Sequence, residues 1–156
     1  MKLIQQAISS ILLFTVIILI TNSCKKEPLP SRPSCEIRSI LPSTVTTGSL
    51  IETIATYEDL EGDIDSVLLV YKWYDGIQVK RRDTFKAAGS FYNITQGVQK
   101  ARIKINIEYA TNTQQSNLKL PAVTKDTTAA FGIILIDKDQ QRSNYSESEK
   151  IRLRKN

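Results

Sequence analysis

Residues 100–110, KARIKINIEYA, alternate strictly between apolar and polar side chains, and few folds tolerate that pattern. It is typical of a half-buried antiparallel strand, because successive side chains of a strand point to opposite faces of the sheet. The same period of two recurs from Cys35 onward, and no later segment has the spacing of an amphipathic helix. The sequence therefore predicts an all-β domain. The residues expected on the buried face of this strand are Ala101, Ile103, Ile105, Ile107 and Tyr109.

Further segments with the same period supply the other strands. DSVLLVYKWYDG ends in Asp75-Gly76, a tight-turn signal, so IQVKRRDTF should return beside it as a hairpin. CEIRSI, AAFGIILID and a last strand from about Asn144 to Leu153 bring the total to about seven, as expected for one antiparallel two-sheet sandwich over residues 35–156. The inward residues expected on two of these strands are Ile51, Thr53, Ala55 and Tyr57, and Val67, Leu69, Tyr71 and Trp73.

Two longer motifs, YEDLEGDIDSVLLVYKW and LIDKDQQRSNYSESEKI, resemble the immunoglobulin-like, fibronectin- or cadherin-like modules of bacterial surface lipoproteins. The resemblance implies an immunoglobulin-like sandwich with an acidic turn between its second and third strands. It also implies a Ser-Asn turn between the last two strands, where Gln140 or Gln141 replaces the usual glycine. Trp73 stands where such sandwiches bury a tryptophan, so we expect a core residue rather than a sugar-binding platform.

The N-terminal segment has the layout of a secretory signal. Residues 11–20, ILLFTVIILI, are fewer than the roughly 20 apolar residues of a spanning helix, and Lys2 and Thr21-Asn22-Ser23 flank them. A retained anchor helix is the alternative. The ending SCKKE resembles a Bacteroidetes-type lipoprotein signal, although Thr21 and Asn22 depart from the usual pattern. The resemblance implies a signal peptide (1–23), a lipid attached to Cys24, a Pro-rich tether (24–34) and an outer-membrane lipoprotein, facing the periplasm or the cell surface.

Composition excludes several kinds of chemistry. The chain has no histidine, which rules out Ser-His-Asp and Cys-His catalysis and most catalytic zinc sites. No Gly-rich phosphate loop is present. A carboxylate-dependent glycan hydrolase remains as an alternative, but no local signature supports it. We therefore expect a protein that is not an enzyme, in which Cys35 is a small buried residue at the start of the first strand.

The acidic stretch EDLEGDID, residues 58–65, offers metal-binding chemistry. Clustered carboxylates on a turn can supply oxygen ligands to Ca²⁺, and Gly62 permits the left-handed backbone of a sharp turn. Sandwich topology brings the loop before the last strand to the same end, beside the tether. The alternative is an ordinary solvated turn that Lys138 and Arg142 neutralise. The candidate calcium ligands are Asp59, Glu61, Asp63, Asp65, Asp137 and Asp139.

The basic residues point to anionic partners. The formal net charge is +5, and Lys80-Arg81-Arg82 and the C-terminal residues are the main basic groups. An anionic glycan or lipopolysaccharide phosphate suits them, with solubility as the alternative, whereas nucleic acid does not suit an exported lipoprotein. We expect a lipid-anchored binding or structural module that meets a glycan or an envelope protein through the loops opposite the tether. The alternative is an accessory subunit that docks onto an outer-membrane assembly through its edge strands.

Overall fold

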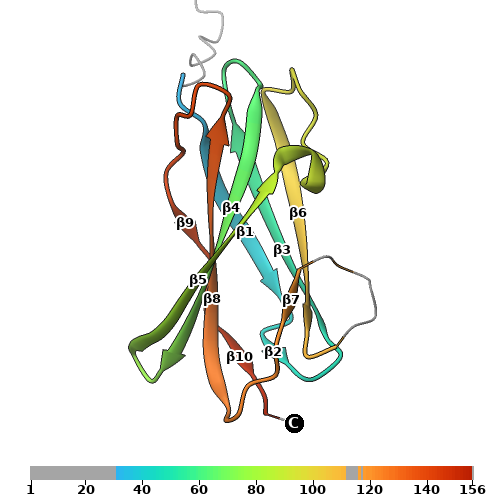
Figure 1. Ribbon diagram of the computed structural model, residues 1–156, viewed down its shortest axis with the longest axis vertical. Helices are drawn as coiled ribbons and strands as arrows, with labels where there is room; N and C mark the ends of the chain where they lie inside the picture. Colours follow the sequence, from blue (N-terminus) through green and yellow to red (C-terminus); the bar gives the residue numbers. More distant parts are fainter. Residues whose placement is uncertain (1–30, 112–115, 117, 156) are drawn as a thin grey trace, which may run out of the picture.

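The computed structural model describes residues 31–111, 116 and 118–155 and is a two-sheet β-sandwich (Figure 1). The all-β prediction is confirmed. The first sheet has the order β1 (Ser34–Leu41), β3 (Leu50–Glu58), β6 (Lys100–Tyr109) and β7 (Lys119–Leu120). The second has the order β2 (Thr44–Val45), β10 (Ile151–Leu153), β8 (Thr127–Asp137), β4 (Ile64–Asp75) and β5 (Gln78–Ala88), with β9 (Ser146–Glu147) also paired to β8. A 3-10 turn, η1 (Gly89–Tyr92), follows β5.

Several predictions about the N-terminus lie outside the described residues. These are the signal peptide (1–23), the lipid-bearing Cys24 and the tether up to residue 30. Among the described residues, no helix is long and apolar enough to cross a membrane. The described chain enters at residue 31, at the end of the sandwich where β4 begins and β8 ends (Figure 1).

The core lies between the sheets and follows the predicted period of two. All four predicted inward residues of β3 are buried, and the three apolar ones share one cluster with Phe131, Ile133 and Leu135 of β8. Of the predicted inward residues of β6, only Ala101, at the start of the strand, remains partly exposed. Each large apolar side chain buried in this way contributes about 1.5–3 kcal/mol to folding. The inward residues of β6 without accessible surface are Ile103, Ile105, Ile107 and Tyr109.

The predicted hairpin is β4–β5, with Asp75 opposite Gln78. Trp73 differs from its prediction, because it is partly buried and packs against the edge of the core. Its ring contacts Tyr71 edge to face, with 6.1 Å between centroids. Its cross-strand partner is Arg81 on β5, a sheet edge with mostly exposed side chains, and the Arg81 guanidinium lies over the indole, 5.9 Å from the ring centroid.

The predicted last strand is interrupted. β9 and β10 both pair with β8, but residues 148–150 between them are not strand. Ser148 maintains the contact here, because its Oγ accepts a hydrogen bond from Phe131 N at 3.0 Å. The Ser-Asn motif also acquires a structural role. Asn144 binds both backbone groups of Cys35, accepting from its N at 2.9 Å and donating to its O at 2.8 Å, and so fastens β1 to the second sheet. Cys35 is buried at the start of β1, as predicted.

Candidate metal centre

The turn between β3 and β4 is held firmly by the segment that precedes β6. Asp59 N donates to Gln99 O at 2.8 Å, and Gly97 N donates to Gly62 O at 2.7 Å. Gly62 has a φ of +66°, the left-handed conformation predicted for it. A Cβ at this position would lie 2.7 Å from Gly97 C, so the close packing requires glycine as well. The turn is therefore a fixed support for its acidic side chains.

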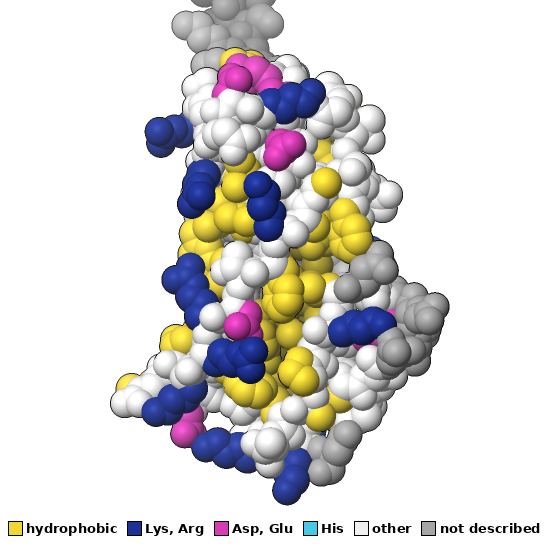
Figure 2. Space-filling model, in the orientation of Figure 1, with side chains coloured by type: hydrophobic (Ala, Val, Ile, Leu, Met, Phe, Trp, Pro, Cys, Tyr) yellow, Lys and Arg dark blue, Asp and Glu magenta, His cyan; other side chains and the backbone are white. Residues whose placement is uncertain are grey.

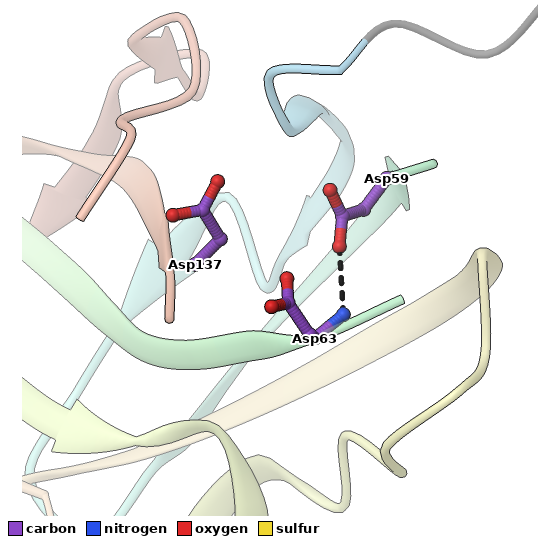
Figure 3. A group of neighbouring side chains, drawn as sticks. All are labelled: Asp59, Asp63 and Asp137. Carbon is purple, nitrogen blue, oxygen red and sulfur yellow. Dashed lines mark hydrogen bonds between the residues drawn. The ribbon is translucent and has the colours of Figure 1, made fainter. Parts of the chain in front are cut away.

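Three carboxylates converge at this end of the sandwich (Figure 3). One oxygen each of Asp59, Asp63 and Asp137 lies within 4.8 Å of the other two. Asp63 N donates to Asp59 Oδ2 at 2.8 Å, and Gln141 N donates to Asp137 Oδ1 at 2.7 Å. Asp137 reaches the turn because β8 pairs with β4 with Asp137 opposite Ile64, the residue after Asp63. We call these three residues the acidic triad.

The electrostatics of the triad are unfavourable without a counter-charge. Asp59 is fully buried, and its Oδ1 has no hydrogen-bond partner among the described residues. Burial raises the pKa of Asp59, and the negative charges of Asp63, Glu61 and Asp137 raise it further, against the hydrogen bond from Asp63 N, which lowers it. An unpartnered buried oxygen costs about 1–3 kcal/mol, more for a charged group. A bound cation would remove this cost.

No lysine or arginine supplies that charge in the described part of the chain. The ion pairs of 4.0 Å or less include none to the acidic triad. Lys138 and Arg142, the predicted neutralisers, are exposed and form no such pair. The acidic triad thus differs from an ordinary solvated turn, in which neighbouring basic residues would neutralise the negative charge.

The other three candidate ligands lie outside the triad. Glu61, Asp65 and Asp139 are all exposed. The pairing of β4 with β8 shifts register between Ile64 and Ser66, so Asp65 is the extra residue of a bulge and does not face Asp137. Sequence reasoning also missed Gly97 and Gln99 as supports of the turn, although a glycine such as Gly97 is itself a turn signal.

The acidic triad could hold a metal ion. Ca²⁺ binds oxygen at about 2.3–2.6 Å, so two ligands on opposite sides of it are about 5 Å apart, close to the spacing here. Three carboxylates would supply three to six of the 6–8 oxygens that Ca²⁺ takes, and water could supply the rest. A cation at this place would join the β3–β4 turn to the end of β8.

Comparisons with known proteins give no family for this chain. No protein-family description and no curated relative matches it. Among solved structures, the alkylpurine DNA glycosylase AlkC of Pseudomonas fluorescens, bound to DNA with an abasic site analogue, is 13% identical over 74% of this chain, with a TM-score of 0.43. Spo0M, a sporulation control protein of Bacillus subtilis, is 9% identical over 81%, with a TM-score of 0.40.

A third solved structure is the CARDB domain of the PF1109 protein of Pyrococcus furiosus, in complex with di-metal ions. It is 9% identical over 86% of this chain and 95% of its own length, with a TM-score of 0.30. This chain spans 30% of the AlkC chain and 51% of Spo0M. Likeness at these scores says nothing about activity. The residues define the class to which the chain belongs, an all-β sandwich with a candidate metal centre at one end.

Proposed function

We propose that this chain is a lipid-anchored, non-enzymatic binding or structural module of the cell envelope, and that Ca²⁺ occupies its acidic triad. The signal-like segment before Cys24 supports the anchor, which would attach the mature chain to the outer membrane. The partner would be a glycan or an envelope protein. The absence of histidine supports a role without catalysis.

The calcium proposal rests on Asp59, whose buried Oδ1 has no partner among the described residues and whose side chain lies beside two further carboxylates. Calcium suits it better than Mg²⁺, which binds at about 2.0–2.1 Å and retains most of its water. Extracellular modules bind calcium with dissociation constants of about 10⁻⁴–10⁻³ M, and we expect a similar affinity for an exported protein of this kind. The ion would stiffen the end of the domain at which residue 31 enters (Figure 1).

A thermal melt of the chain from residue 25 tests the calcium site. A dissociation constant of about 0.1 mM would add about 2.7 kcal/mol at about 10 mM Ca²⁺, which corresponds to about 10 °C for a domain of this size. Asp63→Asn should abolish the shift, because it removes one carboxylate ligand. The turn should stay intact, since the variant keeps the backbone bond from residue 63 to Asp59. Asp65→Asn is the matched control and should retain the shift. An equal response to Ca²⁺ and chelator in the wild type would exclude the site.

Fatty-acid labelling of the full chain in a Gram-negative host tests the anchor. The wild type should incorporate label and fractionate with the outer membrane. Cys24→Ala should lose both properties, whereas Cys35→Ala controls for labelling of the second cysteine. Label retained in Cys24→Ala would contradict lipid attachment at that residue.

One observation favours the alternative of an accessory subunit. β5 is an 11-residue strand that, among the described residues, pairs on one side only. An unpaired edge of this length can accept a strand from another protein. Co-purification of an envelope protein at fixed stoichiometry would favour this reading over a free-standing module.

A further inference from the structure

A groove of about 290 Å³ lies between the β4–β5 hairpin and the segment before β8. We call it the hairpin groove. It lies at the end of the sandwich opposite residue 31 (Figure 1), so a domain tethered at its N-terminus would present the groove outward. None of the acidic triad contributes to it. Its principal lining residues are Trp73, Tyr74, Asp75, Lys80, Val123 and Lys125.

The wall of the hairpin groove is apolar and aromatic. Trp73 is partly exposed while its Nε1 is enclosed, so the part of the indole that lines the groove is carbon. Aromatic faces carry partial negative charge and attract the partly positive C–H groups of a ligand. Figure 2 shows exposed hydrophobic side chains along this side of the molecule, with Lys and Arg side chains beside them. A flat ring with C–H groups on one face would suit this wall.

The opposite wall is held in place by hydrogen bonds that are buried or partly buried. Val123 N donates to the hydroxyl of Tyr109 at 3.1 Å, and that hydroxyl donates to Arg154 O at 2.8 Å. Thr127 Oγ1 donates to Tyr74 O, which joins the segment to β4. A preformed groove binds a small ligand without a large ordering cost.

The charge of the groove favours an anion. Lys125 pairs with Asp75 across the rim at 3.0 Å. Lys80 Nζ donates only to the uncharged side chain of Gln78, at 3.0 Å, and forms no ion pair among the described residues. Two lysines against one aspartate leave a single positive charge, and Lys80, which Asp75 attracts without forming an ion pair, is the lysine with no carboxylate in direct contact among the described residues.

We propose that the hairpin groove binds one acidic sugar residue of a glycan chain. The C–H face of the sugar would lie on Trp73, and its carboxylate or phosphate would pair with Lys80. A volume of about 290 Å³ is at the lower limit for ligand pockets, which suits one ring rather than a folded peptide. The inference rests on the proposed binding function and names its partner class, but it requires neither Ca²⁺ nor the lipid on Cys24.

Fluorescence gives a direct test, because Trp73 is the only tryptophan in the chain. The chain from residue 25 would be titrated with trigalacturonate, glucose 6-phosphate and neutral maltotriose. Each would be added up to about 20 mM, which is enough to saturate a site with a dissociation constant of about 1 mM, or about −4 kcal/mol of binding free energy. One or both acidic sugars should change the emission in a saturable way, and the stronger of them identifies carboxylate or phosphate. Maltotriose should not do so.

Matched variants on one strand establish the position. Lys80→Gln should weaken binding of the acidic sugar about tenfold, as expected for the loss of one charge-assisted bond. Lys86→Gln, the same substitution on the same strand outside the groove, should leave binding unchanged. The proposal fails if no acidic sugar gives saturation, if maltotriose binds equally, or if both variants bind like the wild type. If the sugar titrations fail while the wild type still shows the calcium-dependent thermal shift and still incorporates fatty acid, only the hairpin-groove proposal is overturned. The proposed function would then stand.

Discussion

Asp63 donates its backbone N–H to the buried carboxylate of Asp59, at 2.8 Å from Oδ2, and leaves Oδ1 of that carboxylate without a donor. One oxygen of Asp59 therefore fixes the turn. The other has no hydrogen-bond partner among the described residues, in a side chain that lies beside Asp63 and Asp137 (Figure 3). Asp59 therefore stabilises the turn through the oxygen that accepts a hydrogen bond and destabilises the fold through the unpartnered one. A substitution that keeps the first oxygen and removes the charge can separate these two effects.

Asp59→Asn should stabilise the calcium-free protein. The amide can still accept the hydrogen bond from Asp63 N, while a desolvated negative charge is removed from a cluster of like charges. We expect a gain of about 1–2 kcal/mol in the free energy of unfolding at neutral pH with chelator present, measured by urea denaturation. The variant should not respond to Ca²⁺. A loss of stability in chelator would contradict this account of Asp59.

The pH dependence has a definite sign. Because the pKa of Asp59 is raised in the folded state, the folded protein holds more protons than the unfolded one between the ordinary value of 3.8 and the raised value. In that window the free energy of unfolding of the wild type should fall as pH rises, relative to Asp59→Asn. Urea titrations of both proteins in chelator, from about pH 4 to about pH 7, measure the difference. A difference independent of pH would show that Asp59 does not titrate in the fold.

Gly62→Ala should be strongly destabilising. The substitution meets two obstacles, a φ of +66° and a Cβ position only 2.7 Å from Gly97 C. We expect the free energy of unfolding to fall by more than about 2 kcal/mol in total. The left-handed backbone alone accounts for roughly 1–2 kcal/mol of this loss, and the steric clash supplies the rest. Gly76→Ala is the control, since its φ is +61° but nothing lies within 4 Å of its Cβ. Thermal melts that give equal losses would mean that the turn does not pack against Gly97.

Gln140→Gly should be stabilising. Gln140 has a φ of +63°, so it, rather than Gln141, adopts the left-handed backbone conformation that favours glycine. Relief of the left-handed strain offsets the entropy cost of glycine, with a net gain of up to about 1 kcal/mol. Gln141→Gly should give no gain in the same melt. The prediction is wrong if the two variants behave alike.

Sequence reasoning succeeded where side chains alternate regularly and failed where the backbone departs from that regularity. The inward faces of β3 and β6 follow from a period of two. That rule stops at the acidic turn, so the pattern could not separate Asp59, Asp63 and Asp137 from the three acids that remain exposed. The bulge at Asp65 and the interruption of the last strand at 148–150 arise from pairing with β8.

Trp73 shows a second limit of the sequence. Its position on a regular strand predicts a core residue, and the side chain does pack against the core. Its exposure depends instead on β5 being the sheet edge and on the distant segment around Val123, which together form the hairpin groove. Neither relationship can be read from the residues near Trp73.

The bond between Asn144 and the backbone of Cys35 has a mechanical consequence. The described chain enters at residue 31 and continues directly into β1, which runs along the long axis of the domain beside β3 (Figure 1). Tension between an anchor on that side and a partner held at the hairpin groove would pull along β1 rather than across it. The ladder to β3 and the two bonds to Asn144 would then be loaded together, in shear, instead of being peeled apart one by one.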